Sequence, residues 1–318
     1  MSSYIIKGGN KLEGTVRISG SKNASLPIIA ATILNKGTTT LYNVPNIQDT
    51  QMMYEIIKLL GGKVQKKKNK VIINTSNINK YEIPDALMHK MRSSVIIVGS
   101  IVGRYKTATF TYPGGCEIGS RPIDLHLKAF EKLGIHINQN YGNITCNAEK
   151  IIGNKIDFDF PSVGATENAI LASVLAEGKT TITNAAREPE IIDLQNFLNK
   201  MGAKIKGAGT NEIEIEGVKK LKEISYNVMP DRIESGTFLC LAAITGGKIK
   251  LEKTNPNHLT PIIAKLEEAG CEIKIQKETI EIRRPQKIKS NRYKNNAISR
   301  ISNRYAINNG SNIYNSQR

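Results

Sequence analysis

Four stretches of the chain repeat one alternation of hydrophobic and polar positions. In each, apolar residues recur every three to four positions, a glycine follows, and two short runs then alternate apolar and polar residues around a polar turn. The first spacing is typical of an amphipathic helix and the second of a half-buried strand. The helix positions are Met53, Ile56, Ile57 and Leu60; Ile123, Leu127, Phe130 and Leu133; Ile191, Leu194, Leu198 and Met201; and Leu259, Ile262, Ile263 and Leu266.

A glycine stands at the same place in each stretch. Gly62, Gly134, Gly202 and Gly270 follow one another at intervals of 72, 68 and 68 residues. Glycine is favoured where a helix ends in a left-handed residue. The near-constant interval predicts one α/β unit of about 70 residues used repeatedly, which is longer than the usual solenoid repeat and large enough for a sheet with helices. We therefore expect globular α/β subdomains.

The length of 318 residues favours two domains. The longest apolar run, around residues 94–103, is about half of what a membrane span needs, and the first residues contain no apolar block like that of a signal peptide. The four cysteines lack the paired spacing of a zinc site or a disulfide framework, so reduced thiols are expected. These features predict a cytoplasmic protein with no membrane partner. The cysteines are Cys116, Cys146, Cys240 and Cys271.

The net charge of +17 fits either nucleic acid or small anionic ligands. Residues 285–318 hold seven bases, eight asparagines and no acid, and the chain without them carries +10. A nucleic-acid partner is the weakest hypothesis, because no aromatic residues are interleaved with the basic run at Lys66, Lys67 and Lys68.

Two segments carry the richest candidate chemistry. Residues 18–27 lead from a strand to a helix through Gly and Ser, so Lys22 would stand beside free N–H groups that attract an anion. Residues 113–126 place Cys116 among three glycines, close before Arg121 and Pro122. Pro122 suits the first turn of a helix, and the cationic, donor-rich surroundings favour the thiolate. We interpret Cys116 as a reactive thiol and the other three cysteines as core residues.

Polar clusters also open other predicted helices, at residues 91–94, 162–168, 187–190 and 229–237. Each one alone is typical of helix capping. Their recurrence at the starts of elements equally fits a common site for a polyanion, and the sequence leaves both interpretations open.

These motifs together resemble the UDP-N-acetylglucosamine 1-carboxyvinyltransferases of the EPSP synthase superfamily. The resemblance runs from about Tyr4 to Lys289. It rests on Gly20-Ser21-Lys22-Asn23, Met91-Arg92, Pro113-Gly114-Gly115-Cys116, Arg121-Pro122-Ile123-Asp124-Leu125-His126, Ser162-Val163-Gly164-Ala165-Thr166, Arg187-Glu188-Pro189-Glu190 and Pro230-Asp231-Arg232-Ile233-Glu234.

The resemblance implies an inside-out α/β barrel of repeated units, with two three-unit domains and an active site between them. It implies transfer of the enolpyruvyl group of phosphoenolpyruvate to the 3-hydroxyl of UDP-N-acetylglucosamine, with release of phosphate and without a metal or organic cofactor. Cys116 would be the proton donor. The implied substrate-binding residues are Lys22, Asn23, Arg92, Arg121, Pro122, Ile123, Asp124, Leu125, Ser162, Val163 and Gly164.

The chain departs from the family after about Lys289. Only four of the six units are recognisable, and the motif Pro-Gly-Phe-Pro-Thr-Asp, which holds the family's aspartate base, is missing. Codons compatible with residues 291–305, read one base later, encode Ile-Asp-Ile-Lys-Thr-Met-Pro-Tyr-Pro-Gly-Phe-Pro-Thr-Asp-Met, which contains that motif. Our hypothesis is that an added adenine near the Lys289 codon shifts the frame.

The expected domains are therefore residues 22–229, a complete three-unit α/β domain, and residues 1–21 with 230–289, a second domain with one unit of three. Residues 290–318 would be an out-of-frame, disordered tail. We expect exposed apolar faces, aggregation and little turnover. The alternative is a non-catalytic UDP-sugar-binding remnant.

Overall fold

A computed structural model describes residues 3, 5, 7–89, 91–114 and 122–284 of the chain, with the side chain of Arg92 excepted. The described residues form two compact units, one within Lys22–Met229 and the other comprising the described residues up to Ser21 together with residues 230–284. The proposed out-of-frame tail lies outside the described residues. Helices and strands alternate in both units, so the predicted α/β class is confirmed.

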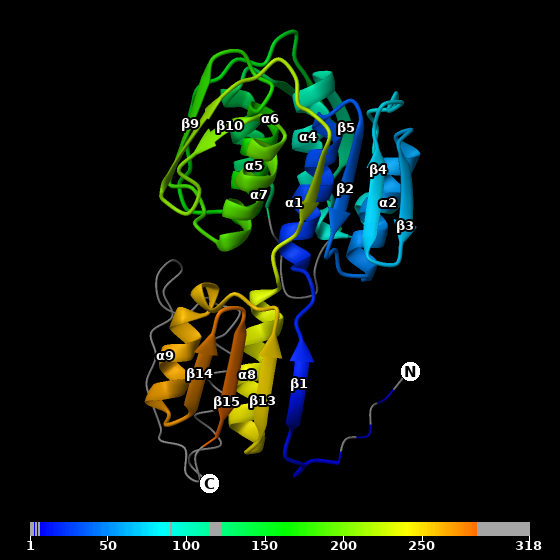
Figure 1. Cartoon of the computed structure of the whole chain (residues 1–318). Helices are drawn as coiled ribbons and strands as arrows, with labels where there is room; N and C mark the ends of the chain where they lie inside the picture. The colour runs from blue at the N-terminus through cyan, green and yellow to red at the C-terminus, as the bar shows by residue number, and fades with distance from the viewer. Residues whose placement is uncertain (1–2, 4, 6, 90, 115–121, 285–318) are drawn as a thin grey trace. The chain divides into compact units, whose positions relative to one another are not determined.

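The Lys22–Met229 unit repeats one arrangement three times: a buried helix, a strand, an amphipathic helix and a β-hairpin (Figure 1). The first copy comprises α1 (Lys22–Ala31), η1 (Thr32–Leu34), β2 (Thr38–Tyr42), α2 (Gln48–Leu59), β3 (Lys63–Lys67) and β4 (Lys70–Asn74). The second comprises α3 (Asp85–Met88), η2 (Arg92–Val95), α4 (Ile96–Tyr105), β5 (Thr107–Thr111), α5 (Asp124–Lys132), β6 (His136–Asn140) and β7 (Asn143–Asn147). The third comprises β8 (Lys155–Asp157), α6 (Val163–Ser173), β9 (Lys179–Thr183), α7 (Pro189–Lys200), β10 (Lys204–Lys206) and β11 (Glu212–Glu216), and is followed by β12 (Ile224–Asn227).

Each copy builds its own sheet. The strand orders are β12-β2-β4-β3, β5-β7-β6 and β10-β11-β9-β8. In the first sheet β12 pairs in parallel with β2, with Ile224 opposite Thr39, so the last strand of the unit returns to its first copy. The described strands form separate open sheets. The copies meet through their helices, which line the core, so the arrangement is the inside-out one that the resemblance implied.

The four predicted helix–strand–strand elements are confirmed as α2-β3-β4, α5-β6-β7, α7-β10-β11 and, in the other unit, α9-β14-β15. Each helix ends in the same way. The glycine has positive φ (Gly61, Gly134, Gly202 and Gly270), and the next residue donates its N–H to the carbonyl five positions earlier. This is the hydrogen bond of a Schellman motif.

The first copy differs from the sequence expectation by one residue. Gly61, with φ +106°, is the left-handed residue, whereas Gly62 packs against Ile57. The prediction of Gly62 was wrong because two adjacent glycines left the register open, and the structure fixes the turn one position earlier.

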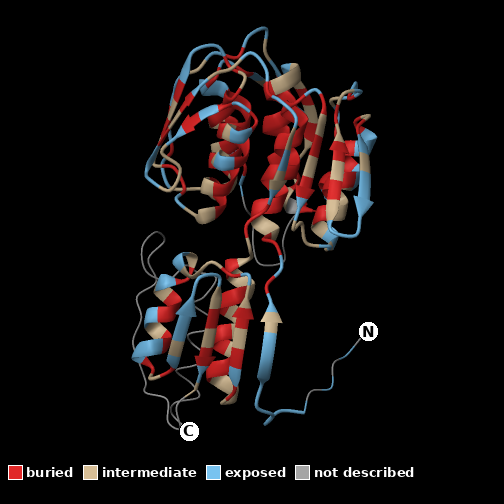
Figure 2. Ribbon diagram, in the orientation of Figure 1, coloured by how far each residue is buried: buried red, intermediate tan, exposed pale blue. Residues whose placement is uncertain are grey.

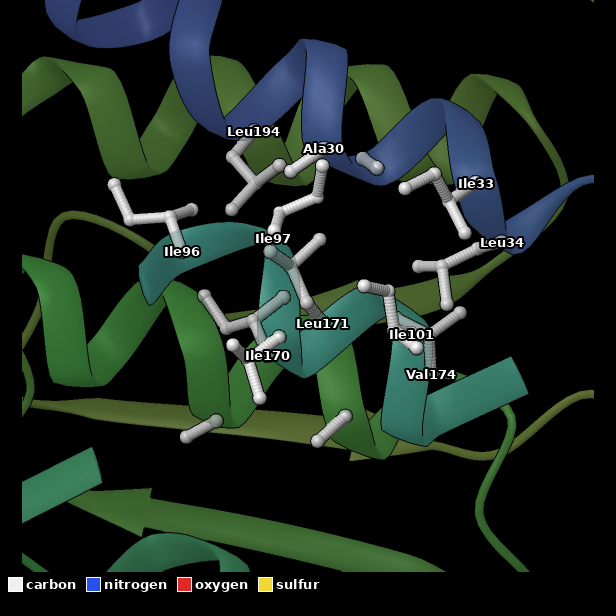
Figure 3. Packing of buried hydrophobic residues seen from close by; sticks show 14 of the residues in the cluster. Ala30, Ile33, Leu34, Ile96, Ile97, Ile101, Ile170, Leu171, Val174 and Leu194 are labelled. Carbon is white, nitrogen blue, oxygen red and sulfur yellow. The ribbon is translucent and has the colours of Figure 1, made fainter. Parts of the chain in front are cut away.

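The core of the larger unit lies around α1, α4 and α6, whose residues are buried on nearly all sides (Figure 2). The amphipathic helices α2, α5 and α7 each keep an exposed side. Side chains from α1, η1, α4, α6 and α7 interdigitate in this core (Figure 3). The labelled members are Ala30, Ile33, Leu34, Ile96, Ile97, Ile101, Ile170, Leu171, Val174 and Leu194.

Two glycines bring α4 and α6 unusually close. A Cβ on Gly99 would lie 2.7 Å from the carbonyl oxygen of Asn168, and one on Gly103 would lie 2.8 Å from that of Leu171. Both values are too short for a real Cβ contact, so the helix approach requires glycine at these positions.

The smaller unit contains one copy of the same arrangement. Its elements are β1 (Glu13–Arg17), α8 (Arg232–Thr245), β13 (Lys248–Glu252), η3 (Pro256–His258), α9 (Thr260–Glu268), β14 (Glu272–Gln276) and β15 (Thr279–Arg283). The sheet order is β1-β13-β15-β14, with β1 and β13 parallel. Leu239, Leu251 and Ile280 belong to its core.

Helix α8 differs from its counterparts α1, α4 and α6. One side packs into the core, but Ile233, Phe238, Leu241 and Ile244 are only half-buried within the described part of the chain. The equivalent helices of the larger unit are covered on both sides by neighbouring copies. The smaller unit therefore leaves a helix of core composition partly open among the residues described.

Candidate functional site

One buried side chain of the larger unit, Asn168 in the middle of α6, joins this helix to the starts of α4 and α5. Its Nδ2 donates to the carbonyl oxygen of Val95 at 2.9 Å, and its Oδ1 accepts from the N–H of Gly99 at 2.9 Å. Nδ2 also lies 2.7 Å from Nδ1 of His126 in α5. Residues that the sequence placed at separate helix starts are thereby fastened together.

His126 in turn lies against the first turn of α6. A Cβ on Gly164 would be 3.1 Å from Cε1 and 3.3 Å from Nε2 of the His126 ring. The ring is 8% exposed. The segments containing residues 122–126 and 162–164 are thus neighbours in space although they are about 40 positions apart in sequence.

Helix α6 begins with the predicted cap. The hydroxyl of Ser162 accepts a hydrogen bond from the N–H of Ala165 at 3.4 Å, a long bond that leaves the helix start weakly capped. Ser162, Val163 and Gly164 are half-buried, and the residues that follow are buried. The first turn of α6 is therefore the part of this helix that a ligand could reach.

The segment before α5 combines exposed and buried positions. Pro122 and Asp124 are exposed, Leu125 is half-buried, and Ile123 is buried in the core. Ile123 also accepts the first hydrogen bonds of α5, from the N–H groups of His126 and Leu127. Ile123 thus anchors a segment whose neighbours remain accessible.

Lys22 and Asn23 are the first two residues of α1, and both are half-buried. The ammonium of Lys22 forms an ion pair with Asp49 in the first turn of α2, with 3.2 Å between Nζ and Oδ2. The two side chains are 45% and 32% exposed. An ion pair this accessible contributes little to stability, so its lysine can exchange partners for an anionic ligand.

Cys116 and Arg121 lie outside the described residues, as does the side chain of Arg92, whose backbone begins η2. The described stem of the Gly-Gly-Cys segment is held tightly. Gly114 donates its N–H to the carbonyl of Met88 at 3.3 Å, and a Cβ on Gly114 would lie 2.2 Å from the carbonyl oxygen of His89. Only glycine can begin the segment at this point.

The other three cysteines are buried, as predicted. Burial raises the pKa of Cys146 and of Cys240 to about 12, and that of Cys271 to about 11. These thiols remain protonated at neutral pH and are poor nucleophiles.

Sequence reasoning missed two buried polar residues. Asn168 belongs to the polar cluster at residues 162–168, which alone is typical of helix capping. The signal that distinguishes it is a carboxamide directly before the apolar run Ala169-Ile170-Leu171. Asp193 in α7 accepts hydrogen bonds from the hydroxyl of Tyr226 at 2.7 Å and from the N–H of Met229 at 3.2 Å. Burial raises the pKa of Asp193 to about 6, although both hydrogen bonds lower it.

Among the residues that the structure describes, no group of three or more His, Cys, Asp or Glu side chains is arranged to hold a metal ion. No described helix is long and apolar enough to cross a bilayer.

Solved structures share this fold. An enolpyruvyl transferase, NikO from Streptomyces tendae, aligns with a TM-score of 0.78 at 21% identity, over 88% of this chain and 67% of that one. EPSP synthase from Acinetobacter baumannii aligns with a TM-score of 0.69 at 21% identity, over 90% and 68%. The repeated units and their helix-centred core are thus those of the enolpyruvyl transferase fold, and this part of the predicted fold class is confirmed.

Sequence comparisons agree. The model of the EPSP synthase (3-phosphoshikimate 1-carboxyvinyltransferase) family matches residues 6–303. UDP-N-acetylglucosamine 1-carboxyvinyltransferase 2 of Caldanaerobacter subterraneus subsp. tengcongensis is 50% identical over 282 residues, covering 89% of this chain and 68% of the relative. The enzyme of the same name from Clostridium tetani is 50% identical over 275 residues, covering 86% and 66%.

The chain belongs to the EPSP synthase family and, within it, to the UDP-N-acetylglucosamine 1-carboxyvinyltransferases. The predicted enzyme class, a carboxyvinyltransferase, is confirmed for the family. The chain spans about two thirds of the length of the curated relatives that it matches.

Proposed function

We propose that this chain carries the substrate-binding part of an enolpyruvyl transferase that acts on UDP-N-acetylglucosamine and phosphoenolpyruvate in peptidoglycan precursor synthesis. The observation that carries the proposal is that the η2–α4 junction and the first turn of α5 are held against α6 through Asn168 and His126. These are the segments that contain most of the residues implied by the family resemblance. Relatives that are 50% identical in sequence and carry this enzyme name support the same activity.

In the proposal, the starts of α5 and α6 bind the UDP part of the sugar nucleotide. Backbone N–H groups in the first turn of a helix are donors without intrahelical partners, and the helix dipole favours an anion there. Ser162, Val163 and Gly164 supply such groups, and His126 of α5 lies beside Gly164. The long Ser162 cap bond is one that a phosphate oxygen can replace at low cost.

Lys22, with Asn23 beside it, binds phosphoenolpyruvate. Its ammonium leaves Asp49, an exposed partner, for the phosphate or carboxylate of the substrate. Arg92 and Arg121 add positive charge around the two anionic substrates. The net charge of +10 that the chain carries without residues 285–318 is consistent with ligands that are polyanions.

The proposed reaction is an addition followed by an elimination. The 3-hydroxyl oxygen of the sugar adds to C2 of phosphoenolpyruvate, while a proton from the Cys116 thiol reaches C3. A proton then leaves C3 as the C2–O bond to phosphate breaks, which restores the double bond and releases inorganic phosphate. The sugar hydroxyl must lose its own proton to a base, which by family resemblance is the aspartate encoded in the alternative reading frame.

Two measurements test the proposal. Isothermal titration of the full chain with UDP-N-acetylglucosamine should give saturable binding. Ser162→Pro should weaken this binding, because proline lacks both the hydroxyl that caps α6 and a backbone N–H. A gene lacking one adenine near the Lys289 codon, extended through its restored frame, should give a protein that releases phosphate from phosphoenolpyruvate in the presence of the sugar nucleotide.

The matched variant in that frame-restored protein is Cys116→Ser, which removes the thiol with little change in size. Mass spectrometry should detect a phosphoenolpyruvate adduct on the parent and none on the variant. An unchanged adduct, or full turnover by the variant, would contradict the role assigned to Cys116. Binding without phosphate release in the frame-restored protein would favour the non-catalytic remnant, and absence of binding would defeat the proposal.

A further inference from the structure

The hydrogen bonds of Asn168 allow only one orientation of its carboxamide. The Gly99 N–H can only donate and the Val95 carbonyl can only accept, so Oδ1 must face the former and Nδ2 the latter. The second hydrogen of Nδ2 is then directed to Nδ1 of His126, 2.7 Å away. Two backbone groups therefore determine which atom the amide presents to the ring.

This orientation also determines the tautomer of His126. A ring nitrogen that accepts a hydrogen bond carries no proton, so Nδ1 is bare and the proton of the neutral ring sits on Nε2. The Nε2 edge is the one that lies against Gly164, in the first turn of α6. A donor is thus held beside the turn in which the proposed function places the diphosphate.

Close packing leaves little space around the Nε2 edge of His126 and around the carboxamide of Asn168. A Cβ on Gly164 would lie 3.3 Å from Nε2, and a Cβ on Gly99 would lie 2.5 Å from Oδ1 of Asn168. The side chains therefore occupy space that any larger residue would take. Asn168 and His126 are both buried, at 0% and 8% exposure, so neither can turn out to solvent without disturbing the core.

We propose that Asn168 is a positioning residue for the sugar nucleotide: from the middle of α6 it holds the first turns of α4 and α5 in fixed relation and directs the Nε2–H of His126 toward the first turn of α6. The inference rests on the proposed function, because it assigns a purpose to the UDP-binding segments named there. Asn168 does not itself touch the ligand. Its effect reaches the ligand through His126 and through the backbone of the joined helix starts.

A purely structural role for Asn168 makes a different prediction. If the carboxamide only fills and satisfies the core, its replacement lowers stability, and ligand affinity follows only the folded fraction. A positioning role requires that affinity fall in variants that remain folded, and that the ring proton move when the amide is inverted. The following variants separate the two roles.

The first variant is Asn168→Asp in the full chain. The carboxylate can still accept from the Gly99 N–H but has no donor for Nδ1 of His126, so the ring should place its proton on Nδ1 instead. Two-dimensional ¹⁵N–¹H spectra of histidine-labelled protein report which ring nitrogen is protonated. We expect a change from the Nε2-protonated to the Nδ1-protonated form, together with roughly tenfold weaker binding of UDP-N-acetylglucosamine, which is about the net value of one hydrogen bond.

The second pair of variants addresses the possibility that a buried aspartate prevents folding. His126→Asn keeps an acceptor for Nδ2 of Asn168 but removes the Nε2 edge, so the fold should survive while affinity falls by roughly tenfold, about the net value of one hydrogen bond. Ser173→Ala is the matched control, because Ser173 lies in the same helix, is equally buried and donates only to the carbonyl of Ala169. The control should bind as tightly as the parent.

Three results would overturn the inference while leaving the proposed function intact. They are parent-like affinity in folded His126→Asn, parent-like affinity in folded Asn168→Asp, and an Nδ1-protonated His126 in the parent itself. If the parent does not bind UDP-N-acetylglucosamine or UDP at all, the proposed function fails, and the role assigned to Asn168 fails with it.

Discussion

The close approach of α4 and α6 predicts a large effect of the smallest possible substitution, Gly99→Ala. The added methyl would lie 2.5 Å from Oδ1, 2.7 Å from the carbonyl oxygen and 3.1 Å from Cα of Asn168. Two of these atoms belong to the backbone of a buried helix and cannot rotate away. The helices must therefore move apart, which disturbs the core of α1, α4 and α6 drawn in Figure 3.

The expected magnitude follows from three contributions. Alanine stabilises a helix interior by about 1 kcal/mol relative to glycine, which opposes the other two contributions. Overpacking costs about 1–3 kcal/mol. Loss of the hydrogen bond from the Gly99 N–H to Asn168 leaves a buried donor unpaired, at about 1–3 kcal/mol. The free energy of unfolding of the larger unit should fall by about 3 kcal/mol, which corresponds to a decrease in Tm of about 6–12 °C for a unit of this size.

Thermal unfolding followed by circular dichroism measures this change, since the chain has no tryptophan for fluorescence. Hydrogen exchange with mass spectrometry assigns the transition to peptides from α4 and α6. The control is Ser100→Ala in the same helix, where the buried hydroxyl finds no hydrogen-bond partner among the described residues, so its loss should be neutral or slightly stabilising. A Gly99→Ala protein that melts at or above the parental Tm would refute the reasoning.

Three further predictions concern other sites. Burial raises the pKa of Asp193 to about 6, so the folded chain binds this proton more tightly than the unfolded chain does. The free energy of unfolding should therefore fall by about 2–3 kcal/mol as pH rises from 4 to 7. Asp193→Asn should flatten this part of the stability profile in denaturant titrations, and an unchanged profile would contradict the prediction. Asp231→Ala should destabilise the smaller unit by about 1–2 kcal/mol, because the Asp231 carboxylate caps α8 by accepting two hydrogen bonds of 2.7 and 3.0 Å. Hydrogen exchange in α8 measures the loss, and unaltered protection of α8 would count against the prediction. Phe238→Glu with Leu241→Lys on the half-buried side of α8 should reduce self-association in light scattering without unfolding the unit, whereas equal aggregation would mean that another surface is responsible.

Much of the fold could be predicted from local pattern. The 3.6-residue and two-residue periodicities identified α2, α5, α7 and α9 with their hairpins, since each element exposes one face and buries the other. The glycine after each helix could also be predicted from the sequence. The first copy is the exception, because Gly61 and Gly62 are equally suited to the left-handed conformation and only the structure shows that Gly61 adopts it.

The buried helices carried a weaker signal. α4 and α6 are buried on nearly all sides, so periodicity does not show which side faces which neighbour. Gly99 and Gly103 could be recognised as close-contact positions only once α6 was seen against them. Similarly, Asn168 resembled a capping residue until its partners in α4 and α5 were known.

The sequence by itself determined the repeated unit, the family and the residue types of the candidate site, because these depend on spacing and identity along the chain. Tertiary structure alone decided that the η2–α4 junction and the start of α5 meet α6, that β12 returns to β2, and that Asp193 is buried beside Met229. Hydrogen bonds between segments dozens of residues apart leave no periodic trace in the sequence, since each partner obeys only the local rules of its own helix or strand. Their geometry arises when the separate units pack.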